Sequence, residues 1–488
     1  MKRAEVVGVK QKTSAPSHAR SETDCQQVAF QFQDLGSRQV VADFGGGYLS
    51  SDGGALLLRQ VDRSVGLSRA LAGCFVDQRD ARFVEHGVEQ LVAQRLYALA
   101  LGYEDLNDHA DLRRDPLLAV AANKPDPLGT NRCAADQGRA LAAPATLQRM
   151  ESAVDHPNSR YHKLAAPPAA LRTLLLQQGV RTLPKGIREV IVDFDATDSR
   201  LHGQQEGRFF HGYYGNYCYL PLLAFIGEVP VWTELRTADG DAARGTVTAL
   251  ALIVTAVRRR CPHAQITVRG DSGFCREELM AWCEQHDVFY VLGLARNPRL
   301  LALLTPTLVR ARERAVHCGG PTREFADLKY RTLDSWSRER RVVGKAEILG
   351  DKDNPRFIVT NLPAETHAAA PLYEKGYCGR GGMENAIKEH QLDLFGERLS
   401  CHGFASNEVR LLLASFAQLL LERLRTIGLA GTTLARATAG TIRLQLLKLA
   451  AQVTVSVRRV HIRFASAFAR QVEFAQAHAQ LAAWIDPG

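Results

Sequence analysis

The chain has 488 residues, a formal net charge of +9 and a pI near 9.1. That length is too great for one hydrophobic core, so roughly two to four domains are expected. The 46% of apolar and 23% of charged residues are ordinary for a soluble globular protein, and the basic balance indicates an anionic partner.

The sequence argues against a secreted, zinc-bound or membrane-spanning protein. The ten cysteines are scattered and include no Cys-x-x-Cys pair, which disfavours zinc and is typical of a reducing cytosol. The start at Met1 lacks the apolar run of a signal peptide. The longest apolar run, residues 411–421, is too short to span a bilayer. We therefore expect a cytoplasmic protein with no membrane partner.

The N-terminal part of the chain divides into a tail and a helical region. Residues 1–25 are polar and without periodicity, which predicts a disordered tail. Helical periodicity recurs through residues 26–180 and is clearest at 88–101, so this region is predicted to be mostly helical. The prolines at 167 and 168 mark its exit.

Strand patterns dominate after Gly186. Residues 190–195 and 265–269 are β-branched runs with a helical pattern at 246–258 between them, which predicts a mixed sheet flanked by helices. The fold class is therefore α/β (mixed α+β). The predicted divisions are a first part of a catalytic core at 186–287, a β-rich insertion at 288–370, a second part of the core at 371–430, and a C-terminal region at 431–488 as a candidate for dimerisation.

Three acidic residues lie in distinctive local sequences. Asp195 follows Val190-Ile-Val-Asp-Phe, Asp271 lies in Val268-Arg-Gly-Asp-Ser-Gly-Phe274, and Glu384 ends a Tyr-x-x-Arg-x-x-x-Glu spacing. The first two end strand-like runs, so each strand would present a carboxylate at its tip. Three carboxylates at one point would suit Mg²⁺, which prefers oxygen ligands. The alternative for a lone aspartate is a turn carboxylate that caps a backbone amide.

These segments resemble the DDE transposases of bacterial insertion sequences and, more closely, insertion sequence family 1380. Further segments that share the resemblance are Val41-Ala-Asp-Phe-Gly-Gly-Gly-Tyr48, Gly102-Tyr-Glu-Asp-Leu-Asn-Asp-His109, Gly203-Gln-Gln-Glu206 and Ile358-Val-Thr-Asn-Leu362. The resemblance covers roughly residues 40–430. It implies an RNase H-like core interrupted by the β-rich insertion and a nucleoid-associated bacterial enzyme. It further implies a homodimer that performs cut-and-paste transposition and binds double-stranded DNA, both the terminal inverted repeats of the element and the target. We expect the helical region, residues 26–180, to be the DNA-binding part.

The resemblance also assigns the acids their roles. Asp195, Asp271 and Glu384 would be catalytic and would bind two Mg²⁺ ions, which Mn²⁺ could replace. The Asp-x-Thr spacing of the motif selects Asp195 over Asp193, which lies on the same face of the strand and would support it. Two other functions stay open: a non-catalytic DNA-binding relative, which the three acids argue against, and a related nuclease that cuts without joining.

One position departs from the family pattern. The signature usually carries a lysine seven residues after the glutamate, where this chain has Gln391. Lys388 lies one helical turn after Glu384, on the same face, and could substitute.

Four residues are predicted to contact DNA. Tyr377, Arg380 and Lys388 share a helical stripe with Glu384, so Arg380 and Lys388 could contact phosphates, although a solvated helix face is the alternative. The fourth is Trp336 in the insertion. Relatives that form DNA hairpins stack a flipped base on such an aromatic ring, whereas packing in the insertion's own core is at least an equal alternative.

Overall fold

The computed structural model describes residues 29–350 and 352–484. The chain divides into two units, Met1–Tyr48 and Leu49–Gly488. The predicted tail, residues 1–25, lies outside the described residues. No helix of the described residues is long and apolar enough to cross a membrane.

The described part of the first unit is a β-hairpin. Strands β1 (Phe30–Leu35) and β2 (Arg38–Ala42) pair antiparallel, and every residue in them is exposed. Gly36 has a φ of 62°, which suits the tight turn between the strands. The prediction of a mostly helical region from residue 26 is therefore wrong for this segment, where alternating residues favour a two-residue period.

Helices occupy most of the chain from residue 55 to residue 181. Helix α3 has the predicted bounds and is buried along almost its whole length. The helices are α1 (Ala55–Val65), α2 (Leu67–Ala72), α3 (Val88–Leu101), α4 (His109–Leu112), α5 (Pro116–Ala121), α6 (Pro144–Ser152) and α7 (Pro168–Arg181). Short strands lie among and beside them: β3 (Leu49–Ser50), β4 (Val76–Asp77) and β5 (Leu164–Ala165).

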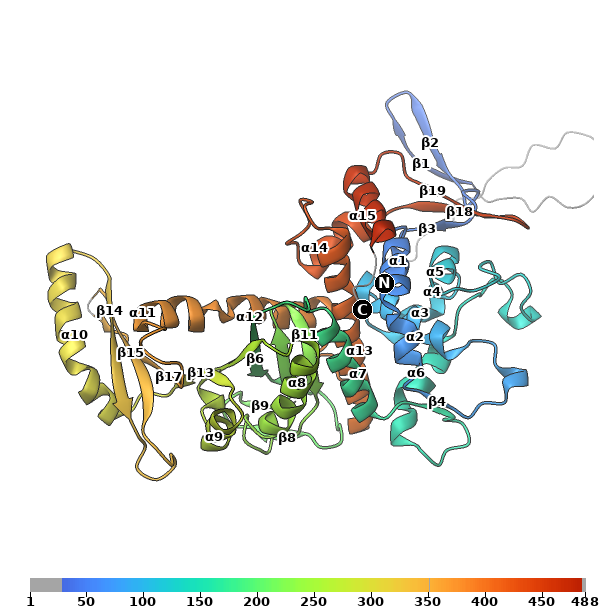
Figure 1. Cartoon of the computed structure of the whole chain (residues 1–488). Helices are drawn as coiled ribbons and strands as arrows, with labels where there is room; N and C mark the ends of the chain where they lie inside the picture. The colour runs from blue at the N-terminus through green and yellow to red at the C-terminus, as the bar shows by residue number, and fades with distance from the viewer. Residues whose placement is uncertain (1–28, 351, 485–488) are drawn as a thin grey trace, which may run out of the picture. The chain divides into compact units, whose positions relative to one another are not determined.

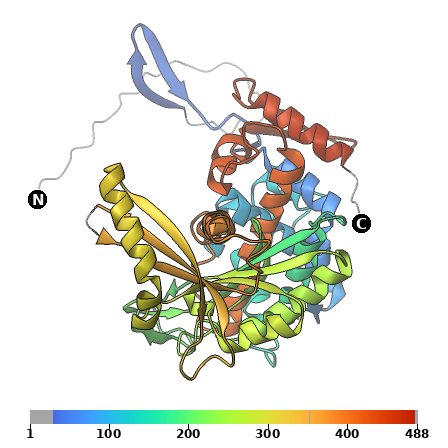
Figure 2. The same ribbon diagram turned by 60° about the vertical axis from the view of Figure 1, so that its left-hand side comes forward.

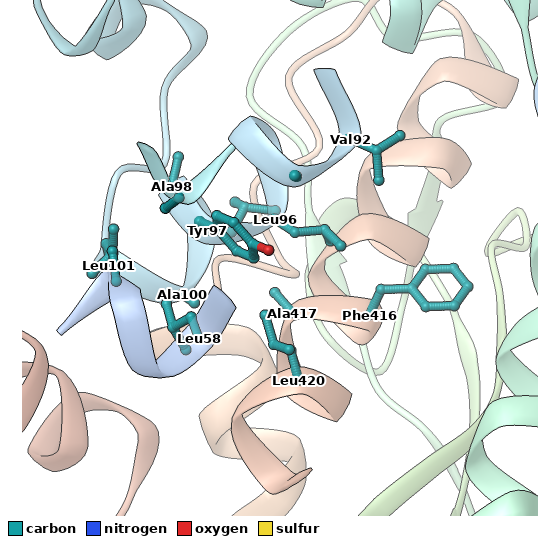
Figure 3. Packing of buried hydrophobic residues seen from close by; sticks show 14 of the residues in the cluster. Leu58, Val92, Leu96, Tyr97, Ala98, Ala100, Leu101, Phe416, Ala417 and Leu420 are labelled. Atoms are coloured by element: carbon teal, nitrogen blue, oxygen red, sulfur yellow. The ribbon is translucent and has the colours of Figure 1, made fainter. Parts of the chain in front are cut away.

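A long buried helix, α13 (Phe404–Arg423), joins this helical region to the rest of the second unit. Leu96 and Tyr97 of α3 belong to the same buried cluster as Phe416 and Leu420 of α13, as Figure 3 shows. The apolar run at 411–421 is thus explained, because a helix that is buried all round carries apolar residues on every face.

The central sheet carries both candidate aspartates. Its core strands lie in the order β11-β10-β6-β12-β13, antiparallel from β11 to β6 and parallel from β6 to β13. These strands are β6 (Glu189–Ala196), β10 (Leu222–Ile226), β11 (Val229–Glu234), β12 (Gln265–Gly270) and β13 (Phe289–Leu294). Helices α8 (Thr246–Arg260) and α9 (Glu277–Gln285) pack against them in one buried cluster.

The predicted β-rich insertion continues this sheet. Strand β17 (Arg356–Thr360) pairs with β13, and β15 (Arg340–Leu349), β14 (Thr322–Tyr330) and β16 (Lys352–Asp353) follow. Two corrections follow. The predicted bounds of the insertion, 288–370, include β13, which pairs in parallel with β12 of the central sheet. The insertion also contains a 21-residue helix, α10 (Pro298–Cys318), coloured yellow in Figure 1, which Pro306 obscured because proline usually breaks helices.

An almost continuous helical segment lies across the sheet and is seen end on in Figure 2. Met383 and Ile387 pack against Leu223 and Phe225 of β10. The segment comprises α11 (Ala369–Pro371), a π-helical stretch (Leu372–Tyr377), a 3₁₀ turn (Cys378–Arg380), α12 (Gly381–Lys388) and a second π-helical stretch (Glu389–Asp393).

The C-terminal region adds a small sheet and a helix. The predicted strand-like run at 453–462 is two antiparallel strands, β18 (Ala451–Val455) and β19 (Val460–Phe464), and β18 also pairs with β3. Helix α15 (Gln471–Ala483) closes the described chain, after α14 (Ala439–Ile442). The role of this region in dimerisation stays a prediction.

Candidate active site

Two of the three acids leave the same edge of the sheet. Asp195 is the next-to-last residue of β6, and Asp271 directly follows β12. These strands are parallel neighbours, with Arg269 opposite Asp193, so their C-terminal ends meet at one edge. Asp271 also accepts a hydrogen bond from the amide of Gly273, at 2.8 Å. Asp271 therefore lies at the predicted strand end and also caps a backbone amide, which was the alternative role.

The third acid comes from the helical segment above that edge. Glu384 lies in the first turn of α12 and is exposed. Its neighbour Met383 is held against Leu223 of β10, and Leu223 lies opposite Asp195 in the strand register. Helix packing therefore carries Glu384 towards the end of β6.

The three carboxylates influence one another electrostatically. The pKa of Asp195 is raised to about 6, mainly by burial; the charge of Arg380 lowers it, and the negative charges of Asp271 and Glu384 raise it. Repulsion of this kind requires that the groups lie near one another in a region of low dielectric constant. The three acids predicted from the sequence therefore lie near enough for Asp271 and Glu384 to act electrostatically on Asp195.

A buried ion pair that the sequence did not predict connects two strands of the sheet to the helical segment before Glu384. Arg269 donates to both carboxylate oxygens of Asp193, at 2.7 Å each, and to the carbonyl of Gly376, at 2.6 Å. Both side chains are buried. Arg269 thus ties β6 and β12 to the segment before Glu384. Its place inside an apolar strand, beside Asp271, was the signal available in the sequence.

Arg380 and Tyr377 face the acids from the same helical segment. Arg380 is buried and pairs with Asp195 at 3.3 Å, and its Nε atom has no hydrogen-bond partner. The hydroxyl of Tyr377 lies against Gly293, where a Cβ atom would approach it to 2.6 Å. Burial raises the pKa of Tyr377. Only glycine fits at position 293, because Tyr377 and the backbone around Asp271 both press on it.

The two candidates for the basic position lie differently. Lys388 is exposed and makes no ion pair with any other described residue. Gln391 instead donates from its side-chain amide to the hydroxyl of Thr197, at 3.1 Å. Thr197 follows Asp195 by two residues, so the side chain at position 391 reaches the end of β6.

Trp336 is not placed for base stacking. Its side chain is 3% exposed and lies in the core of the sheet, edge-on to Tyr330 with the Arg340 guanidinium over its ring. The packing alternative therefore describes it, because a ring enclosed by Tyr330 and the strands beside it presents no face to DNA.

The three acids are of the residue type that binds a divalent metal ion, but their side chains are not close enough together to hold one. Carboxylate oxygens are the donors that a hard cation prefers. Among residues 29–350 and 352–484, however, no three His, Cys, Asp or Glu side chains lie close enough together to hold an ion. Arg380 occupies one oxygen of Asp195. The carboxylates would have to draw together, and Arg380 to move, for a metal to bind.

Aspartates at two neighbouring strand ends, with a glutamate on the overlying helix, are arranged as the resemblance to DDE transposases predicts. The family model described as Transposase DDE domain group 1 matches residues 32–485, and the chain belongs to this family. No curated protein matches the sequence. Among solved structures, the chain is similar to a piggyBac transposase in a cryo-EM synaptic complex with hairpin DNA. The identity is 9% and the TM-score is 0.38, over 80% of this chain and 79% of that chain.

Proposed function

We propose that this transposase performs cut-and-paste transposition of an insertion sequence of family 1380 by cutting and rejoining DNA at the element's terminal inverted repeats. The observation that carries the proposal is the convergence of Asp195, Asp271 and Glu384 at one edge of the sheet. The order β11-β10-β6-β12-β13, antiparallel and then parallel, supports an RNase H-like core. Inverted repeats on both sides of the gene, specifically cleaved by the purified protein, would test it.

We propose Asp195, Asp271 and Glu384 as the metal ligands. Bound Mg²⁺ would supply Lewis-acid chemistry, by activating water or a 3′-hydroxyl and stabilising the leaving oxygen. The chain itself supplies the frame: the pair of Arg269 with Asp193 holds both strand ends in place. Arg380 pairs with Asp195 and, once displaced, would be free to contact a DNA phosphate.

The helical region offers a second surface for DNA. A pocket of about 400 Å³ among α6 and the loops before α3 and α7 is lined by six cations and two carboxylates, Glu85 and Asp136. Burial first, and then the charges of neighbouring cations such as Arg132 and Arg113, lower the pKa of His86 in this pocket to about 3, as expected in a positive environment. The cations are Arg79, Arg113, Arg132, Arg149, Arg160 and Lys163. We propose that this pocket contacts the phosphates of the element's ends.

Two exposed cations of this pocket test that assignment. Arg149 and Lys163 have no acidic partner at ion-pair distance among the described residues. Arg149→Ala and Lys163→Ala should each weaken double-stranded DNA binding severalfold and lower the slope of log affinity against log salt by about 0.9, because each phosphate contact releases counterions. The matched control is Lys185→Ala, at another exposed lysine. Unchanged affinity and slope in both pocket variants would remove the pocket from the DNA interface.

The departure at position 391 gives a further prediction. If Lys388 replaces the family lysine beside the scissile phosphate, Lys388→Ala should slow cleavage roughly ten- to a hundredfold, since one charge-assisted contact is lost. Gln391→Ala should matter less, because an amide carries no charge. Adding Gln391→Lys to Lys388→Ala should restore part of the rate, since position 391 reaches Thr197. A normal rate in Lys388→Ala with a slow Gln391→Ala would reverse the assignment. Cleavage kinetics on a labelled end measure all three.

We also propose that two copies act together, one on each end of the element. The two ends must be cut and joined in a coordinated way, which a homodimer in a synaptic complex would accomplish. The C-terminal region, residues 431–488, is the proposed site of pairing.

A further inference from the structure

A hairpin beside the acids exposes an unusual number of aromatic rings. Strands β8 (Phe209–His211) and β9 (Asn216–Tyr219) pair antiparallel around a turn closed by a 2.8 Å hydrogen bond from the Gly215 amide to the His211 carbonyl. We call residues 208–217 the aromatic hairpin. Four of its rings are exposed: Phe209, Phe210 (59%), Tyr213 (86%) and Tyr217. Several large rings left in water on ten residues mark a contact surface.

One face of the hairpin carries a platform made of two aromatic rings and a guanidinium group. The Arg208 guanidinium lies 4.6 Å over the Tyr217 ring, and Phe210 meets the same ring edge-on at 5.6 Å. Arg208 has no acidic partner among the residues that the structure describes and donates to the carbonyl of Gly203, at 2.8 Å. A cation beside flat rings matches a nucleotide, whose phosphate is negative and whose base has two flat faces.

The turn of the hairpin reaches the catalytic acids. Tyr214 and Ala196, the residue after Asp195, pack against the same small buried cluster of Cys218, Leu220 and Ala238. Burial, together with the negative charges of Asp198, Asp195 and Asp271, raises the pKa of Tyr214 to about 12. Asn216 donates to Asp198 at 3.4 Å. The buried Nδ1 atom of His211 and Oδ1 atom of Asn216 have no hydrogen-bond partner. The platform thus lies beside the place where a DNA strand would be cut.

We infer that the aromatic hairpin stacks against unpaired DNA bases next to the scissile bond. The inference rests on the proposed function, which puts DNA at Asp195 and Asp271. Inside a duplex both faces of a base are covered by its neighbours, so only an unpaired or flipped base offers a face to a ring. The exposed rings of this hairpin can supply the stacking that the buried Trp336 cannot.

The test compares two kinds of DNA. Fluorescence anisotropy would measure the affinity of the full chain for single-stranded oligothymidine and for a blunt duplex of random sequence. Phe210→Leu and Tyr213→Ala should each lower the affinity for oligothymidine about tenfold, as expected for one lost stacking contact, and leave that for the duplex unchanged. Phe210→Trp, which keeps a ring, should retain the wild-type affinity. Photocrosslinks from 5-iodouracil should map to residues 208–217.

The outcomes distinguish a failure of this inference from a failure of the proposed function. Equal losses on both DNAs, no loss in either ring-removing variant, or a change of oligomeric state with normal DNA binding would overturn the inference. Asp271→Asn keeps the hairpin and should keep the preference for oligothymidine. If the wild-type protein neither cuts nor joins DNA, yet shows the ring-dependent preference, the proposed function fails while the inference stands.

Discussion

Replacement of Asp271 by asparagine is expected to reduce strand cleavage about a thousandfold, because a lost metal ligand removes several kcal/mol of transition-state stabilisation. Asn has the size of Asp, and its side-chain oxygen can still accept the hydrogen bond from the Gly273 amide. Asp195→Ala and Glu384→Ala should have effects of the same order. Cleavage of a labelled element end in Mg²⁺ measures the rate, and anisotropy on the same DNA should show binding largely intact.

The matched control is Glu365→Gln, an exposed acid outside the site. It should cleave at the wild-type rate. If any of the three variants cleaved as fast as this control, that residue would have to be removed from the proposed site. A variant that lost DNA binding and cleavage together would likewise contradict the assignment, because metal ligation is the proposed role.

Removal of Asp193 should have the largest effect on stability. Asp193→Ala leaves the Arg269 guanidinium buried without its counter-charge, so the free energy of unfolding should fall by roughly 3–5 kcal/mol. Because Arg269 also holds the carbonyl of Gly376, the helical segment that carries Glu384 should loosen and cleavage should slow. Urea denaturation followed by circular dichroism measures the first effect, and cleavage of the labelled end measures the second.

Arg312→Ala provides the comparison, since Arg312 pairs with Asp353 at the surface. An exposed pair is screened by water, so its loss should leave stability almost unchanged. If Asp193→Ala proved as stable as Arg312→Ala, the buried pair would not be the element that fixes the site to the sheet.

The sequence could predict those parts of the site that depend on local pattern. Asp195 and Asp271 follow β-branched runs, and a strand followed by an acid predicts a carboxylate at a sheet edge whatever the rest of the fold. Helix α3 was likewise predictable to the residue, because its apolar periodicity extends over fourteen positions between two glycines. The hairpin at residues 30–42 was missed because its short alternating pattern was included in a longer region with helical periodicity.

Contacts between distant segments could not be read from local patterns. Arg380 looked like a phosphate ligand on a helix stripe, whereas the fold turns it inwards to Asp195, which lies 185 residues away in the sequence. For Trp336 the sequence left base stacking and core packing open, and the fold decides for packing, because Arg340 and Tyr330 enclose the ring. Burial of this kind depends on which strand lies beside which, and no periodicity specifies that.

The central claim is most directly tested by strand transfer. A pre-cleaved element end with a free 3′-hydroxyl would be incubated with the protein, a target plasmid and Mg²⁺, and the products separated on a denaturing gel. The account predicts a covalently joined product from the wild-type protein and none from Asp271→Asn. Cutting of element ends without any joined product would identify a nuclease instead of a transposase. A joined product from Asp271→Asn would show that the chemistry lies elsewhere.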